Sequence, residues 1–327
     1  MSPSDLFPPR LSWSAAAIAA AIGAPAAVHA AFPERPITLV VAYAPGGGTD
    51  TAARVLARGL QRALNQSIVV ENKPGAGGTI GASAVMRANP DGYTLLFADP
   101  AFVINTGLMP NVGYDLKKDF LPISTITRSP LVLTVHTGLP VENLTTLVAS
   151  AFKKPGGLSY SSAGIGTTPH MAGEMLKFYT KAPFTHIPFK GSGPAMSNLV
   201  AGQLDFSFST IPPAKSFIQL NKIRAIATTG PERSRDFPDV PTVAETIPGF
   251  NVQFWTGLFA PANTPPAVIQ TINEAVRKTL ADPEIKALIE KTGDTPAYLS
   301  TEQVASFVNE EQKRWSSLIK EAGIKAE

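Results

Sequence analysis

The stretch Tyr43-Ala-Pro-Gly-Gly-Gly-Thr-Asp-Thr-Ala-Ala-Arg54 is the segment around which this chain is organised. It follows a short apolar run rich in β-branched residues, Ile37-Thr-Leu-Val-Val-Ala42, which predicts a buried strand. After it, Val55, Leu56 and Leu60 recur at helical spacing. The three glycines therefore stand at a strand-to-helix turn, where no Cβ shields the backbone N–H groups.

A helix that starts at such a turn gathers unpaired N–H donors and the positive end of the helix dipole, so it can bind an anion. We expect Thr49 or Asp50 to cap this helix. A bare turn without a ligand is the alternative. The functional interpretation is favoured because a second turn of the same kind follows a later predicted strand, at Ser162–Thr167.

Composition excludes several classes of protein. With 327 residues, of which 44% are hydrophobic, the chain can bury a large core, and its length suggests two domains. The formal net charge of +3 is too small and too scattered to indicate nucleic-acid binding. The absence of cysteine excludes disulfides, cysteine nucleophiles, thiolate metal sites and a lipid-anchoring cysteine.

The N-terminal segment predicts export. Residues Leu11 to Val28 are almost wholly small and apolar, and the small residues at the end of the run predict cleavage after Ala30. The alternative is an uncleaved membrane anchor, but Gly23 and Pro25 would interrupt its helix. We therefore predict a signal peptide over residues 1–30 and a soluble, exported mature protein.

Strands and helices alternate along the mature chain. Further strands are predicted at 68–71, 93–98, 158–161, 184–187, 206–209 and 223–228. This alternation indicates parallel sheets with helices on their faces, and such sheets bind ligands at the carboxyl ends of their strands. Both glycine-rich turns would emerge at such ends.

Two longer extended runs, Ile123–His136 and Val252–Phe259, predict crossings between two sheets. The predicted fold is α/β with two lobes joined by two crossing strands that act as a hinge. Residues 31–129 form the first part of lobe 1 and residues 130–254 form lobe 2. Residues 255–327 return to lobe 1 and contribute the C-terminal helices.

Nucleotide binding and hydrolysis are not supported by the motifs. The first turn lacks the Gly-Lys-Ser/Thr ending of a phosphate loop, and in Lys73–Thr79 the third dinucleotide-binding glycine is replaced by Ile80. No Gly-x-Ser-x-Gly elbow or His-Glu-x-x-His motif occurs. An exported hydrolase acting on a small ester or amide is the rival class of protein, and a plain interaction domain is a third.

Several segments, in order along the mature chain, resemble one known family, the Bug-type receptors of tripartite tricarboxylate transport systems. The segments that carry the resemblance are Pro45-Gly46-Gly47-Gly48-Thr49-Asp50, Glu71-Asn72-Lys73-Pro74-Gly75-Ala76-Gly77-Gly78, Asn89-Pro90-Asp91-Gly92-Tyr93-Thr94, Ser161-Ser162-Ala163-Gly164-Ile165-Gly166-Thr167, Pro188-Phe189-Lys190-Gly191, Gly202-Gln203-Leu204-Asp205 and Asp239-Val240-Pro241-Thr242. The resemblance implies a periplasmic binding protein of the type II two-lobe fold, without enzymatic activity, cofactor or metal. It also implies a monomer that closes on a small carboxylate and serves membrane transporter subunits.

In that family the first glycine-rich turn holds a carboxylate, partly through ordered waters, and the second lobe supplies further donors. Two opposed anion-binding turns favour a dicarboxylate, either aliphatic or aromatic. The predicted ligand-binding residues are Tyr43, Gly46, Gly47, Gly48, Asp50, Thr51, Gly78, Phe102, Ser162, Gly164, Gly166, Thr167, His170, Lys190, Gly191 and Asp205.

Some of these positions carry open alternatives. Asp50 either caps the helix, orders a bridging water or meets an ammonium group of the ligand. His170 is either a ligand contact or a core histidine, and Lys190 either pairs with an anion or is simply exposed. Asp205 either faces the cleft or closes a helix-to-strand turn. The family often carries a small hydroxyl residue and a histidine after the third strand, so Phe102 there predicts a more apolar pocket wall.

Overall fold

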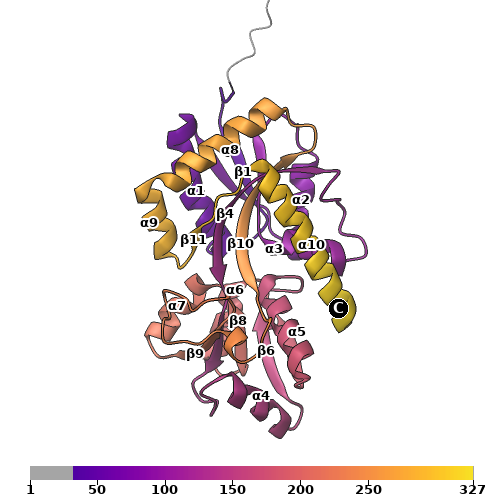
Figure 1. The fold of residues 1–327 in the computed structure, drawn as a ribbon, viewed down its shortest axis with the longest axis vertical. Coiled ribbons are helices and arrows are strands. Elements are labelled where there is room, and N and C mark those ends of the chain that lie inside the picture. Colours follow the sequence, from indigo (N-terminus) through magenta and orange to yellow (C-terminus); the bar gives the residue numbers. More distant parts are fainter. Residues whose placement is uncertain (1–31, 327) are drawn as a thin grey trace, which may run out of the picture. The chain divides into compact units, whose positions relative to one another are not determined.

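The computed structural model describes residues 32–326, which form ten α-helices and eleven strands in two sheets (Figure 1). This confirms the predicted α/β fold with two sheets. The predicted signal peptide lies outside the described residues. Within residues 32–326, every helix is too short or too polar to cross a membrane.

The first sheet has the strand order β11-β4-β10-β3-β1-β2. Its strands are β1 (Ile37–Val41), β2 (Ile68–Asn72), β3 (Thr94–Ala98), β4 (Phe120–Pro130), β10 (Gln253–Pro261) and β11 (Thr295–Pro296). Strand β1 pairs in parallel with β2 and β3, whereas β10 runs antiparallel to both β3 and β4. The carboxyl ends of β1, β2 and β3 therefore lie at one edge.

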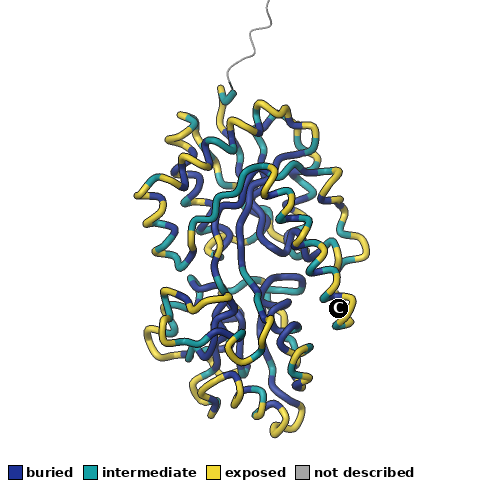
Figure 2. Tube along the Cα trace, in the orientation of Figure 1, coloured by how far each residue is buried: buried dark blue, intermediate teal, exposed yellow. Residues whose placement is uncertain are grey.

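Both faces of the first sheet are covered by helices, as Figure 1 shows. Leu39 and Val41 pack against α1 (Gly48–Leu64), α8 (Pro266–Ala281) and α9 (Pro283–Lys291). Val40, on the opposite face, packs in a cluster with α2 (Thr79–Met86), α3 (Pro100–Leu108) and α10 (Thr301–Ala322). The β-branched run predicted as a buried strand is thus buried on both sides (Figure 2).

The second sheet has the strand order β7-β6-β8-β5-β9. Its strands are β5 (Val132–His136), β6 (Leu158–Ser162), β7 (Phe184–Pro188), β8 (Phe206–Ser209) and β9 (Ile223–Thr228). Its helices are α4 (Leu144–Lys153), α5 (Thr168–Thr180), α6 (Ser192–Val200) and α7 (Ile211–Gln219). We call each sheet with its own helices the first half and the second half.

The chain passes between the halves twice. It leaves the first sheet at Leu131, between β4 and β5, and returns at Val252, just before β10. Thr229 joins both crossings: its hydroxyl accepts from the Leu131 N–H at 2.8 Å, and its carbonyl accepts from the Val252 N–H at 3.1 Å. The two extended runs of the sequence are therefore side by side where they change sheets.

Two helices and one packing arrangement differ from the expectations. Helix α3 was not predicted, although Asp99 caps it through the Ala101 N–H at 2.9 Å. Helix α7 was hidden by consecutive prolines, which are tolerated in the first turn of a helix. The C-terminal helix α10 does not pack on the first half alone, because Trp315 and Ile319 share a buried cluster with Met171 of α5.

Candidate ligand site at the two glycine-rich turns

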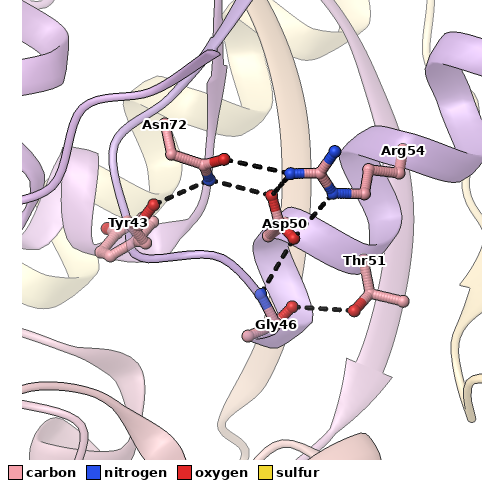
Figure 3. A network of polar contacts seen from close by, with 7 residues as sticks. Tyr43, Gly46, Asp50, Thr51, Arg54 and Asn72 are labelled. Atoms are coloured by element: carbon pink, nitrogen blue, oxygen red, sulfur yellow. Dashed lines mark hydrogen bonds and ion pairs between the residues drawn. The ribbon is translucent and has the colours of Figure 1, made fainter. Parts of the chain in front are cut away.

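The turn after β1 is held in place by Asp50 (Figure 3). The Asp50 carboxylate is 3% exposed and accepts from the Gly46 N–H at 3.0 Å, the Asn72 amide at 2.9 Å and Arg54 Nε at 2.9 Å. Asn72, at the end of β2, also donates to the Tyr43 carbonyl at 2.9 Å. One carboxylate thus ties together the turn, the first helix and the neighbouring strand.

The prediction that Thr49 or Asp50 caps the first helix is therefore wrong. The N-cap position of α1 is Gly47, which has no side-chain cap, and neither Thr49 nor Asp50 caps the helix. Burial alone would raise the pKa of Asp50, but the hydrogen bonds from Arg54, Gly46 and Asn72 outweigh it and hold the pKa below its ordinary value. Asp50 is a charged residue that shapes the turn.

This network decides which donors of the turn are left for a ligand. The Gly46 N–H is used by Asp50, and the Thr51 hydroxyl donates to the Gly47 carbonyl at 3.0 Å. The N–H groups of Gly47, Gly48 and Thr49 make no hydrogen bond within residues 32–326. They stand at the N-terminus of a helix of 17 residues, where the helix dipole favours negative charge.

Asp99, which the sequence did not single out as a site residue, lies behind the same turn. Its buried carboxylate accepts from the Tyr43 hydroxyl at 2.7 Å and the Thr49 hydroxyl at 2.8 Å, besides capping α3. Burial raises the pKa of Asp99 above its ordinary value, and the bonds from Tyr43 and Thr49 reverse only part of that rise. Burial and then the Asp99 charge raise the pKa of Tyr43 well above its ordinary value, so its hydroxyl keeps its proton.

Gly78, the last predicted residue of the first half's turns, lies beside Tyr43. An added Cβ on Gly78 would be 2.9 Å from the Tyr43 hydroxyl oxygen, and its φ of +95° also requires glycine. The adjacent Gly77 carbonyl accepts from the Asn105 amide at 2.8 Å. The turns after β1, β2 and β3 thus form one connected edge.

In the second turn, most of the predicted donors are already engaged. The Ser162 hydroxyl accepts from the Gly164 N–H at 3.1 Å and lies 2.7 Å from His186 Nε2. The Thr167 hydroxyl donates to the Gly164 carbonyl at 2.6 Å. The Gly166 N–H donates to His170 Nδ1 at 3.2 Å. Ser162, Gly164, Gly166 and Thr167 therefore build the turn.

His170 is a core histidine rather than an exposed contact. It is 4% exposed and stacks on His186, with ring centroids 4.2 Å apart. Burial lowers the pKa of His170 to about 4, and burial followed by the His170 neighbour lowers that of His186 to about 3. Both rings are neutral near pH 7, so the Gly166 N–H keeps its acceptor.

Three polar side chains that the sequence did not single out lie where the halves meet. The hydroxyls of Thr168 and Thr210 and the Asn105 Oδ1 are buried and have no hydrogen-bond partner within the described chain. An added Cβ on Gly48 would lie 3.2 Å from Thr210 Oγ1, and one on Gly166 would lie 2.0 Å from Asn105 Oδ1. Unpaired groups of the second half and of α3 thus border the two turns.

The remaining predicted residues are not all brought to this edge. Lys190 is exposed, and the Gly191 N–H donates to the Ala163 carbonyl at 3.1 Å. Asp205 accepts from Lys154 Nζ at 2.8 Å and from the Ser159 N–H at 2.7 Å, at the amino end of β6. Since the second turn follows the carboxyl end of β6, Asp205 lies at the opposite edge of the sheet and closes a turn there.

Phe102 is a core residue of the first half. Its ring stacks on Tyr114 with centroids 5.0 Å apart and contacts Phe120 edge-on at 4.9 Å. It borders a cavity of about 10 Å³, which is too small for a carboxylate ligand. The expected apolar pocket wall is thus a buried aromatic cluster.

A larger depression of about 510 Å³ lies between α1 and β2 and is lined by Arg54, Arg58 and Arg62. These arginines are already paired: Arg54 with Asp50, and the other two with Glu284. The depression is therefore a solvated ion-pair surface and differs from the edge where the two halves meet.

Two α/β halves, crossed twice by the chain and facing each other with the carboxyl ends of their strands, define the class of protein as a solute-binding protein. The family model described as "Tripartite tricarboxylate transporter family receptor" (TctC) matches residues 52–324. The chain belongs to this family. The family resemblance stated from the sequence is confirmed.

Solved structures agree with this assignment. The periplasmic binding protein BugD is 34% identical, with a TM-score of 0.85 over 90% of this chain and 100% of its own. R. palustris Rpa4515 with adipate is 32% identical, with a TM-score of 0.86 over 90% and 99%. MatC (Rpa3494) from Rhodopseudomonas palustris with bound malate is 33% identical, with a TM-score of 0.82 over 88% and 100%.

The function class follows from these matches. The family model describes a transporter receptor and BugD is a periplasmic binding protein, and two of these relatives were solved with a small carboxylate, adipate or malate. The chain is accordingly a solute-binding protein and not an enzyme, and the rival class of an exported hydrolase is set aside.

Proposed function

We propose that this protein is a periplasmic receptor that captures a small dicarboxylate between its two halves and delivers it to the membrane subunits of a tripartite tricarboxylate-type transporter. The observation that carries the proposal is the set of unpaired donors at the first turn, the N–H groups of Gly47, Gly48 and Thr49. The Thr210 hydroxyl of the second half, which has no partner within the described residues, lies next to Gly48: a Cβ added there would be 3.2 Å from Thr210 Oγ1.

The hydrogen bonds that these N–H donors can make are strong enough for micromolar binding of a carboxylate. A hydrogen bond to a charged group contributes about 1.5–3 kcal/mol net, so three or four supply much of the ~8 kcal/mol of a micromolar complex. A carboxylate held by one half alone would stay half in water, where those bonds are weakest. Closure of the second half excludes that water, so the ligand favours the closed arrangement.

Two solved relatives support a dicarboxylate as the ligand. Rpa4515 was solved with adipate and MatC with malate, and both molecules carry two carboxylates. In this chain a second carboxylate has the unpaired Thr168 hydroxyl and the N-terminus of α5, a helix of 13 residues, within the second half.

Closure requires a hinge, and we assign it to the two crossings. In this proposal residues 31–129 and 255–327 form one lobe and residues 130–254 form the other. The chain would bend at Leu131 and Val252, which are both hydrogen-bonded to Thr229. We also propose that residues 1–30 are removed on export, so the periplasmic protein should have an intact mass that begins at Ala31.

The test is a ligand-induced shift of the melting temperature of the mature chain, unfolded and refolded to strip any bound solute. Acetate, succinate, adipate, malate and citrate form the panel. A ligand at ~100 times its dissociation constant adds about 2.7 kcal/mol by mass action. Dicarboxylates should give the largest shifts. If all five compounds leave the melting temperature unchanged, the proposed ligand class is wrong.

A matched set of threonine variants then locates the site. Thr168→Val and Thr210→Val each remove a hydroxyl that has no hydrogen-bond partner among residues 32–326, and each should lower dicarboxylate affinity several-fold. Thr271→Val is the control, because Thr271 is exposed on α8 and its hydroxyl donates only to the Ala267 carbonyl. Equal affinities in all three variants would exclude the site. Small-angle scattering should show a smaller radius of gyration with ligand than without.

A further inference from the structure

Two buried acids, Asp50 and Asp99, flank the start of α1, and they differ in whether a cation pairs with the carboxylate. Asp50 has a cation, since Arg54 Nε lies 2.9 Å from its carboxylate. Within residues 32–326, Asp99 receives only neutral donors, from Tyr43, Thr49 and the Ala101 N–H. Among the described residues no lysine, arginine or histidine forms an ion pair with Asp99. The positive helix end therefore has one uncompensated acid behind it.

Resting on the function proposed above, we infer that Asp99 sets the charge preference of this site: it opposes a second negative charge at the start of α1, so that capture of a carboxylate is coupled to uptake of a proton. The geometry supports this through Thr49. The Thr49 side chain donates to Asp99 at 2.8 Å, whereas its backbone N–H belongs to the unpaired set. A carboxylate on that N–H and the Asp99 carboxylate would bind to the same residue.

Two carboxylates bound to the same residue in a buried site do not both stay ionised at little cost. One of them takes up a proton, or the anion binds more weakly. Asp99 is the group that accepts the proton, because burial already raises its pKa and no cation opposes that rise. The ligand charge raises the pKa of Asp99 further, so protons are taken up between its free and bound values.

The other titratable groups at Asp99 and at the two glycine-rich turns keep their charge state over the working range. The pKa values of Tyr43 and Tyr114 are raised by burial, so both phenols stay neutral. Asp50 has a lowered pKa and stays ionised, paired with Arg54. The stacked histidines of the second half stay neutral as well, with pKa values of about 4 and about 3. Asp99, whose pKa is raised by burial, is therefore the group of this set whose charge responds to the ligand.

The experiment is isothermal titration calorimetry of the ligand-stripped mature chain with acetate, adipate and malate. Each titration is made at one pH in two buffers of different ionisation enthalpy, which reports the protons taken up. The wild type should take up a measurable fraction of a proton and bind more tightly as the pH falls from about 8 to 5.5. Asp99→Asn should take up none, and it should bind roughly tenfold or more tightly at pH 7.5, the effect of one like charge within ~10 Å at an effective dielectric near 20.

Two further variants make the result decisive. Asp99→Ser also removes the charge but keeps a side chain that caps α3. Asp115→Asn is the control for net charge, because Asp115 is exposed and its carboxylate contacts the nearby N–H groups of Lys117 and Lys118 and forms an exposed ion pair with Lys118. Asp115→Asn should match the wild type in affinity and in proton uptake.

The outcomes separate the inference from the function on which it rests. Binding by the wild type without proton uptake overturns the inference and leaves the receptor intact. Weaker binding by both Asp99→Asn and Asp99→Ser, each folded by circular dichroism, also overturns it, since Asp99 would then assist the ligand. If the wild type binds none of the three carboxylates, the proposed function and the inference both fail.

Discussion

Gly48→Ala should weaken dicarboxylate binding without lowering the stability of the ligand-free protein. Gly48 begins α1 in the first half, and Thr210 precedes α7 in the second half. A Cβ on Gly48 would lie 3.2 Å from Thr210 Oγ1 and 3.5 Å from both Thr210 Cβ and Cγ2. The added methyl group therefore crowds a contact that exists only while the halves are together.

The size of the effect follows from these distances. Thr210 must move by a few tenths of an ångström, and overpacking of this kind costs about 1 kcal/mol in the closed arrangement, which is about a fivefold loss of affinity. Rotation of Thr210 offers little relief, because all three of its side-chain atoms lie at 3.2–3.5 Å. Alanine is a better helix former than glycine, so the melting temperature of the ligand-free variant should not fall.

Calorimetry with adipate and malate measures the loss, and Thr210→Ala provides the control. Once the Thr210 side chain is shortened, Gly48→Ala should cost nothing more, so the double variant should bind like Thr210→Ala alone. The reasoning is refuted if Gly48→Ala binds like the wild type, or if its loss persists in the Thr210→Ala background.

Three further outcomes are expected. Gly59→Ala should destabilise the fold by about 2 kcal/mol in urea unfolding, because its Cβ would lie 2.2 Å from Thr279 Cγ2, while dicarboxylate affinity stays unchanged. Asp50→Asn should cost about 2 kcal/mol at pH 6. Since the folded pKa of Asp50 is lowered, its stabilisation is present above the unfolded value of about 4 and is lost as the pH falls through the folded value, so the difference from wild type should shrink below pH 4. Glu311→Leu should cost about 3 kcal/mol, followed by tryptophan fluorescence, because Glu311 accepts from the indole N–H groups of both Trp255 and Trp315.

Much of the fold was predictable because its signals are local. The β-branched run at Ile37–Val41 and the helical spacing of Leu56 and Leu60 are visible in a few neighbouring residues. The helix at Pro100–Leu108 was not predicted although Asp99 and Pro100 are a good start signal, because the interpretation of this segment rested on Phe102 as a pocket wall. The contact of Trp315 with α5 was not predictable, since it joins residues far apart in the sequence.

The site was predictable only in outline. The sequence located the turns, but it did not reveal that Asp50 uses the Gly46 N–H or that His170 uses the Gly166 N–H. The rule that ligands bind at the carboxyl ends of parallel strands, applied to every strand, would have predicted the site more accurately. Thr210 directly follows the carboxyl end of β8, where ligands of parallel sheets bind, whereas Asp205 precedes the amino end of the same strand. The rule selects Thr210 and rejects Asp205.

The donors that are used and the donors that are left have complementary roles. Hydrogen bonds within the chain, such as Gly46 to Asp50 and Thr167 to Gly164, hold both turns in shape before any ligand arrives. A turn that is already ordered does not lose conformational entropy on binding, so its remaining N–H groups act at nearly full strength. Removing an internal bond should therefore weaken binding by loosening the turn, and removing an unpaired hydroxyl should weaken it by direct loss of a contact. Only the first kind of change should also lower the melting temperature of the ligand-free protein, and this difference sorts the residues of the site into their two roles.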